Sequence, residues 1–186
     1  MSFAVLRLAA PLAFVLAAFP AMAGAPVWKV DRASSELAFT AVQAGAPVEG
    51  RFEDWTAEIS FDPAAPETAR IRTTVNVASA RTGQAQIDGT LPSDTWFDAP
   101  AFPEAVFEAR GATVTGEGSY EAAGTLTIKG VSVPVSLPFA LEIDGDTATA
   151  AGKLELSRDA WKIGAGIPEG TVATAVSVSF RITATR

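Results

Sequence analysis

The sequence predicts an all-β protein with about eight antiparallel strands closed into a barrel. Residues 131–143 alternate without exception between apolar and small or polar side chains, which is typical of a strand with one buried face. Similar segments follow one another at short spacing, with turn residues between them. A two-sheet sandwich would produce the same pattern. We favour closure because it removes exposed edges in a chain without cysteine.

The first three expected strands are residues 36–42, 57–61 and 71–77. In each, one parity is apolar or small: Leu37, Phe39 and Ala41; Ala57, Ile59 and Phe61; Ile71, Thr73, Val75 and Val77. The third strand carries Arg70 and Arg72 on its other parity, so we expect a basic outer face there.

Residues 78–103 form a longer excursion between strands. The segment holds Trp96, Phe97 and Phe102 among several prolines, and a turn or two of helix is expected near residues 84–91. It is too apolar to extend freely into water, so we expect it to cover part of the barrel.

The remaining strands are expected at residues 105–109, 120–128, 131–143, 147–156 and 172–182. Lys129-Gly130 and Asp144-Gly145 are the turn residues of two tight hairpins. The last strand again places its apolar residues, from Val172 to Ile182, on one parity.

Residues 1–23 have the pattern of a cleaved secretory signal peptide, which leaves a single domain at residues 24–186. Arg7 supplies the positive charge, residues 8–19 the short apolar core, and Ala21-Met22-Ala23 the cleavage signal. An uncleaved N-terminal anchor is the alternative. The expected mature protein is therefore exported.

The composition excludes several classes of function. The net charge is −7, and −8 without residues 1–23, which argues against nucleic acid as a partner. The chain has no cysteine and no histidine, so disulfides, thiol catalysis, imidazole bases and metal sites of these ligands are excluded. Carboxylate pairs such as Asp94 and Asp98, or Glu53 and Asp54, follow no catalytic motif. We therefore expect neither an enzyme nor a metal protein.

Five ordered blocks of the chain resemble one known family. The blocks are Trp28-Lys29-Val30-Asp31 with Ser35 and Phe39; Gly50-Arg51-Phe52 with Ile59-Ser60-Phe61-Asp62-Pro63; Thr82-Gly83 with Asp88, Leu91, Trp96-Phe97-Asp98, Phe102-Pro103 and Phe107; Leu126-Thr127-Ile128-Lys129-Gly130-Val131 with Pro134-Val135 and Leu137; and Ser157-Arg158-Asp159 through Gly164. They are similar to the YceI-like periplasmic proteins. The family often has histidine where this chain has Ser34, and an Arg-Asp pair with a nearby histidine where it has Ile87-Asp88 and Thr90.

The resemblance implies a lipocalin-like barrel in the periplasm that carries or stores a polyisoprenoid lipid or isoprenoid quinone and needs no other cofactor. A membrane redox protein is a possible partner, and either a monomer or a homodimer fits. A self-packed stress-response or protein-interaction module without bound lipid remains the alternative, because an eight-stranded barrel either fills its own interior or holds one small ligand.

The candidate cavity-lining residues come from the apolar parities. They are Phe39, Phe52, Ile59, Phe61, Ile71, Val75, Phe107, Leu126, Ile128, Val133, Val135, Leu137, Val178 and Phe180. Their alternative role is to fill a solid core. Aromatic residues near proline- and glycine-rich loops form either an entrance rim or a plug: Trp55, Trp96, Phe97, Phe102 and Trp161.

Three arginines are candidates for contact with a head group, because guanidinium forks bind phosphate or quinone oxygens. They are Arg70, Arg72 and Arg81, for which a solvated sheet face is the alternative. Arg158 and Asp159 are expected to form a salt bridge.

Overall fold

The computed structural model describes residues 25–186, so the expected signal peptide, with Arg7 and the cleavage site at 21–23, lies outside the described residues. The strands are β1 (Val27–Gln43), β2 (Ala46–Phe52), β3 (Trp55–Ser60), β4 (Arg70–Asn76), β5 (Ala80–Arg81), β6 (Glu104–Arg110), β7 (Thr113–Gly116), β8 (Ser119–Ile128), β9 (Val131–Asp144), β10 (Thr147–Ser157) and β11 (Ala175–Thr185). The helices are α1 (Ala85–Thr90) and the 3₁₀ turns η1 (Pro66–Thr68), η2 (Val77–Ser79) and η3 (Arg158–Trp161). In this part of the chain, no helix has the length and apolar character needed to cross a bilayer.

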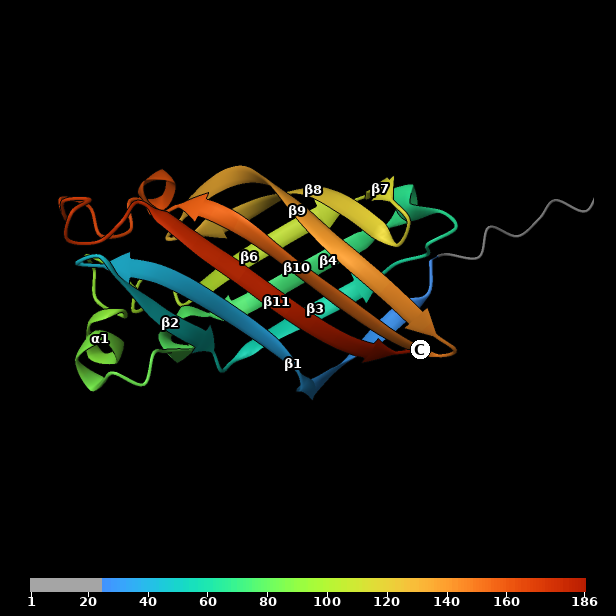
Figure 1. Ribbon diagram of the computed structural model, residues 1–186, viewed down its shortest axis with the longest axis horizontal. Helices are drawn as coiled ribbons and strands as arrows, with labels where there is room; N and C mark the ends of the chain where they lie inside the picture. Colours follow the sequence, from blue (N-terminus) through green and yellow to red (C-terminus); the bar gives the residue numbers. More distant parts are fainter. Residues whose placement is uncertain (1–24) are drawn as a thin grey trace, which may run out of the picture.

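The strands close into the expected antiparallel barrel. The order around the ring is β1, β3, β4, β6, β8, β9, β10 and β11, and β11 returns to pair with β1, where Phe39 lies opposite Val178. Figure 1 shows the long strands β9, β10 and β11 crossing the barrel obliquely, in front of β4 and β6. Closure leaves this ring without a free edge, as predicted.

The barrel wall is interrupted at the same level in two neighbouring segments, between β2 and β3 and between β4 and β5. β2 and β3 are both antiparallel to β1 and are separated only by Glu53 and Asp54, while η2 separates β4 from β5. Ser79 in η2 holds the break together: its carbonyl accepts from the Glu53 N–H at 3.2 Å and its hydroxyl from the Asp54 N–H at 3.0 Å. As a result, β2 and β5 extend the wall at one end of the barrel.

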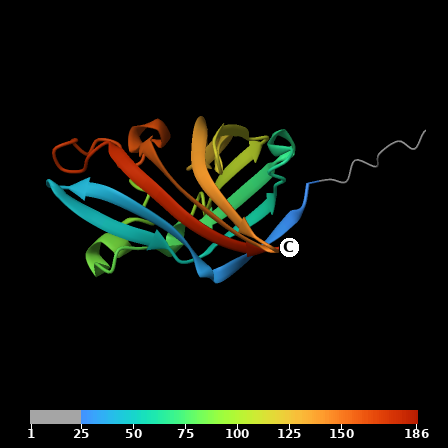
Figure 2. The ribbon, with the colours of Figure 1, turned by 45° about the vertical axis from the view of Figure 1, so that its right-hand side comes forward.

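The segment 82–103 and the loop that follows η3 lie at this end. α1 lies beside the β1–β2 hairpin, while the C-terminus and residue 25 lie at the other end (Figures 1 and 2). The Gly164 N–H donates to the Thr95 carbonyl at 2.7 Å, and the Ala44 N–H donates to the Thr171 carbonyl at 2.9 Å. These bonds join the covering segments to each other and to the barrel.

The alternation in residues 131–143 predicted the buried face of β9 correctly. Its odd-numbered residues are buried or half-buried, and its even-numbered residues are exposed. Inside the barrel, one buried cluster includes Trp28, Phe61 and Phe139, and a second includes Trp55 and Trp161.

Several boundaries differ from the sequence prediction. The β9–β10 turn is centred on Gly145-Asp146, because Asp144 still pairs with Thr147. β2 was not expected, since Pro47 and Gly50 interrupt its alternation. The last strand begins at Ala175, and Val172 makes only an isolated bridge to Gln43.

The other two expectations for local structure are confirmed. α1 occupies residues 85–90, within the expected helical turn. Lys129 and Gly130 have φ angles of 50° and 73°, as a two-residue type I′ hairpin requires.

Candidate functional site

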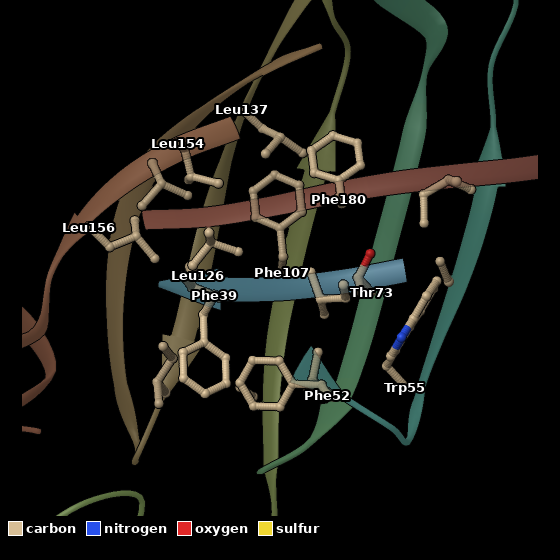
Figure 3. Close-up of a pocket in the computed structure, with 18 of the residues that line it drawn as sticks. Phe39, Phe52, Trp55, Thr73, Phe107, Leu126, Leu137, Leu154, Leu156 and Phe180 are labelled. Carbon is tan, nitrogen blue, oxygen red and sulfur yellow. The ribbon is translucent and has the colours of Figure 1, made fainter. Parts of the chain in front are cut away.

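The barrel encloses a cavity of about 300 Å³, at the small end of the range for ligand pockets. Its surface is almost entirely carbon. Thr73 supplies the single aliphatic hydroxyl of the lining, and Arg158 supplies its single ionisable side chain. Figure 3 shows Thr73 and Trp55 directed into the space that Phe39, Phe107 and Phe180 border. Such a cavity can bind an apolar chain by burial alone, with few polar groups to orient it.

Thirteen of the fourteen predicted lining residues lie along this cavity: Phe39, Phe52, Ile59, Phe61, Ile71, Val75, Phe107, Leu126, Ile128, Val135, Leu137, Val178 and Phe180. Val133 does not border the cavity, although it packs against the same cluster of Trp55 and Trp161 as its neighbour Val135. Their contact with a ligand remains a prediction.

Several lining residues were not among the predicted ones. Leu154 and Leu156 of β10 and Val176 of β11 also border the cavity. Their parity could have indicated this, because Leu154 and Leu156 alternate with the exposed Lys153 and Glu155.

Three glycines face the interior and explain why the barrel is not full. A Cβ added at Gly50 would lie 2.7 Å from Cε1 of Phe39, which is its cross-strand partner. The same 2.7 Å separates a Cβ at Gly124 from Cε2 of Phe107, and a Cβ at Gly152 from Cε1 of Phe180. The three rings thus lie back over positions without side chains. This arrangement keeps aromatic bulk on the wall and leaves the centre open.

Of the predicted rim residues, Trp55 and Trp161 form walls rather than a solvent-facing rim. Trp55 is 3% exposed and Trp161 is 2% exposed, and the Trp161 indole N–H donates to the Leu126 carbonyl at 3.1 Å. Outside the barrel, the guanidinium of Arg32 lies 3.6 Å from the centre of the Trp55 ring. Both tryptophans are therefore buried wall residues of the cavity.

The other three predicted rim residues come from segment 82–103. Trp96 and Phe97 border the cavity, and the Phe97 ring packs edge-on against Phe52 with centroids 6.2 Å apart. Phe102 does not reach the cavity: it is 38% exposed and lies over Gly130 of the β8–β9 turn. Its side chain covers the hairpin because glycine leaves room there.

An aromatic cluster closes the opposite end of the barrel. The rings of Phe61 and Tyr120 meet edge-on at 5.1 Å, and those of Tyr120 and Phe139 stack at 5.5 Å. The Trp28 indole N–H donates to the Phe61 carbonyl at 2.9 Å. The covered end, with α1 and the loop after η3, is therefore the better candidate for ligand entry.

Arg158 borders the cavity but has no hydrogen-bond donor to offer a ligand. Its side chain is 4% exposed, and all of its guanidinium nitrogens donate to backbone carbonyls. The acceptors are the carbonyls of Ile163, Gly164, Ile167, Val172 and Ala173. It also forms the expected ion pair with Asp159, at 3.1 Å. Arg158 therefore organises residues 158–174.

None of the three candidate head-group arginines borders the cavity. Arg70 and Arg72 alternate along β4 with the inward Ile71 and Thr73, so strand parity directs them to the outer wall. Arg72 is paired with Glu108. Arg81 donates to the carbonyls of Ala78 and Ala80.

Two carboxylates, the half-buried Asp88 and the exposed Asp31, have a lowered pKa. The pKa of Asp88 lies below its usual value chiefly because it accepts from the Thr82 hydroxyl and N–H, each at 2.7 Å. The pKa of Asp31 is lowered by hydrogen bonds, first from the Ser34 side chain. Within residues 25–186, no group of three or more acidic side chains is placed to hold a metal ion. Neither of these two aspartates borders the cavity.

Comparison with known proteins gives the same fold. The family model described as the YceI-like domain matches residues 28–184. A UPF0312 protein of Pseudomonas savastanoi pv. phaseolicola is 35% identical over 88 residues, which are 47% of this chain and 46% of that protein. A Shewanella baltica relative is 30% identical over 121 residues, 63% of each chain. The alignments thus span about half to two thirds of these curated relatives.

Solved structures agree over more of the chain. BcnA of Burkholderia cenocepacia has a TM-score of 0.82 and 32% identity, covering 84% of this chain and all of that one. The YCEI protein of Campylobacter jejuni has a TM-score of 0.69 and 26% sequence identity, and the match covers 75% of this chain and 85% of that one. A polyisoprenoid-binding domain of Saccharophagus degradans has a TM-score of 0.68 and 15% sequence identity, and the match covers 85% of this chain and 97% of that one. At this identity the similarity shows the fold alone.

Proposed function

Because this chain belongs to the YceI-like domain family, we propose that it holds a polyisoprenoid chain in its barrel cavity, as a carrier or store rather than an enzyme. The ligand would be the tail of an isoprenoid quinone or of another prenyl lipid. The observation that carries the proposal is the apolar cavity of about 300 Å³ inside a closed barrel. The Saccharophagus degradans domain, described as polyisoprenoid-binding, supports the same ligand class.

The cavity surface suits a ligand that offers only hydrocarbon. Burying one five-carbon isoprene unit contributes about 4 kcal/mol, at about 0.8 kcal/mol per carbon group removed from water. The contribution is spread over many wall residues, so removing one side chain should weaken binding only in part. A tail of several units also extends beyond one small cavity, which gives the covered end of the barrel a role in admitting the chain.

The lining supports binding rather than catalysis. Its single ionisable group, Arg158, donates to five backbone carbonyls and has no N–H left for a ligand. Thr73 is the remaining polar side chain apart from the tryptophans, and no general base borders it. The hydroxyl is placed to donate to, or accept from, a quinone or phenol oxygen at the end of the chain.

A self-packed interaction module is less well supported. It requires an interior filled by large side chains, whereas Gly50, Gly124 and Gly152 leave the centre of this barrel open.

We also propose export to the periplasm, with cleavage before Gly24. Intact mass of the protein recovered from the periplasmic fraction tests this: a chain that begins at Gly24 supports export. A chain that retains Met1 and remains in the cytoplasm contradicts it.

Native mass spectrometry of the purified protein, followed by solvent extraction, tests lipid binding. We expect a co-purified prenyl lipid, and we expect delipidated protein to take up an added prenyl quinone. The informative variant is Leu137→Trp, which narrows the cavity, with Ser136→Trp on the exposed face of β9 as its matched control. No lipid and no uptake in the wild-type protein, or equal uptake by both variants with folding intact, would contradict the proposal.

A further inference from the structure

A second concave site lies on the outside of the barrel, where β1 leaves β3. The two strands pair only at Val27 with Ser60 and at Trp28 with Ile59. Farther along, β1 is irregular between Asp31 and Glu36 and then pairs with β2. The result is a groove of about 720 Å³ over β1, β3, β4 and β6; the last three lie side by side in Figure 1.

The groove is basic although the protein is acidic. It holds five of the thirteen lysines and arginines of residues 25–186, namely Lys29, Arg32, Arg70, Arg72 and Arg110. It holds only two of the 21 acidic residues, Glu58 and Glu108. Its formal charge is therefore +3 in a chain of net charge −7.

At one end of the groove, two arginines face each other across the sheet. Arg70 of β4 is the direct cross-strand partner of Arg110 of β6, and the next outward pair is Arg72 with Glu108. The second pair forms a salt bridge. Like charges directly opposite destabilise a sheet, so the Arg70–Arg110 pair works against folding.

Neither arginine is neutralised nearby. In residues 25–186, no carboxylate lies within 4.0 Å of the charged nitrogens of Arg70, Arg110 or Lys29. Arg32, in contrast, is engaged over Trp55 and donates to the Glu53 carbonyl at 3.0 Å. Three cations, from β1, β4 and β6, are therefore available to a ligand.

We propose that this outer groove is a binding site for a phosphate-bearing anion, with Arg70 and Arg110 as the principal ligands and Lys29 at its side. Two adjacent guanidinium groups offer forked N–H donors that match the oxygens of a phosphate monoester, diester or pyrophosphate. The anion would replace mutual repulsion of the arginines with two attractive contacts. The site is separate from the lipid cavity and does not depend on its occupancy.

The test uses the intact mature protein at low ionic strength, where surface charges are least screened. One arm titrates inorganic pyrophosphate by calorimetry. The other measures co-sedimentation with phosphatidylglycerol vesicles, with phosphatidylcholine vesicles as the uncharged comparison. The variant is Arg70→Gln with Arg110→Gln. The matched control is Lys153→Gln with Arg181→Gln, which removes the same charge from exposed positions of β10 and β11.

We expect the wild type and the control to bind in at least one arm, and the groove variant to bind about tenfold more weakly, the effect of losing a charge-assisted contact. Binding to pyrophosphate alone identifies a soluble phosphate ligand, and binding to vesicles identifies a lipid head group. Absence of wild-type binding in both arms, or equal weakening by the control, overturns the proposal. Uptake of prenyl quinone should be the same in all of these variants. A negative result for anion binding can therefore be distinguished from a negative result for lipid binding in the cavity.

Discussion

The Nη1 of Arg158 donates a hydrogen bond of 2.9 Å to the carbonyl of Gly164. The Gly164 N–H in turn donates to Thr95, in the segment that covers the same end of the barrel. Gly164 has a φ of 64°, so its left-handed backbone presents the carbonyl and the N–H to these two partners. The buried arginine therefore determines the position of both covering segments.

Replacing Arg158 with methionine should destabilise the protein strongly. Five backbone carbonyls lose the donor that Arg158 supplies, and in the described part of the chain only that of Gly164 keeps another, the Ile167 N–H. We expect a loss of about 3–5 kcal/mol in the free energy of unfolding, measured by urea denaturation. Arg181→Met, at an exposed position of β11, is the control and should change stability little. Equal stability of the two variants would mean that the carbonyls find other partners.

The alanine variant of Gly50 should reduce both stability and the capacity of the cavity. The new Cβ must displace the Phe39 ring, 2.7 Å away, and approaches the Arg81 carbonyl at 2.9 Å. Overpacking of this kind costs about 1–3 kcal/mol. Uptake of a prenyl quinone should fall, and adding Phe39→Leu should restore it in a double-mutant cycle. Gly116→Ala is the control, because a Cβ there makes an ordinary 3.6 Å contact with Ser119. Additive effects of the two substitutions would show that the Cβ at position 50 does not act through the Phe39 ring.

The alternation of side chains predicted the strands and most of the inner face, whereas closure into a barrel was predicted from the cost of exposed edges in a chain without cysteine. In β9, every residue from Val131 to Ile143 lies on the face that its parity predicts. Parity also predicted that Arg70 and Arg72 lie on the outer face of the barrel, where the structure has them, and their contact with a head group remains a prediction.

The open interior could not be predicted in the same way. Whether an inward phenylalanine fills the lumen or lies along the wall depends on the residue opposite, and this requires the strand register. Phe180 lies over Gly152 because β10 and β11 pair at those residues. Likewise, the outer groove forms because β1 separates from β3 after two residue pairs. The side-chain pattern of neither strand predicts this separation.

Thr73→Val should separate the polar from the apolar part of ligand binding. Valine keeps the shape of threonine and removes the single hydroxyl of the lining. We expect a prenyl quinone or prenyl phenol to bind about 2- to 10-fold more weakly, as one hydrogen bond of about 0.5–1.5 kcal/mol is lost. A prenyl hydrocarbon should bind unchanged or slightly better. Fluorescence titration of both ligands checks this, and equal effects on the two would exclude the hydroxyl as the head-group contact.

The turn before α1 should loosen in acid. The pKa of Asp88 is lowered in the folded protein, first by the Thr82 hydroxyl and then by the Thr82 N–H. Since the folded pKa is the lower one, the stabilisation is present above about the ordinary value of 3.8 and is lost as pH falls below it. Hydrogen exchange at the Thr82 amide should therefore accelerate below that pH, after correction for intrinsic rates. Asp88→Asn removes this dependence; an unchanged pH profile in that variant would assign the effect to another group.

Arg110→Glu should stabilise the fold while abolishing anion binding in the outer groove. The substitution places a carboxylate directly opposite Arg70, which converts a repulsive cross-strand pair into an attractive one. Such pairs contribute about 0.2–1 kcal/mol, which corresponds to a rise of about 1–4 °C in Tm for a domain of this size. Lys153→Glu makes the same change of charge opposite Ser179, where there is no like charge to relieve, and should leave Tm unchanged or lower it. Differential scanning calorimetry at low salt compares the two, and the gain should shrink as salt screens the pair. A lower Tm for Arg110→Glu than for Lys153→Glu would show that the two guanidinium groups do not repel each other, and would remove the energetic argument for the groove.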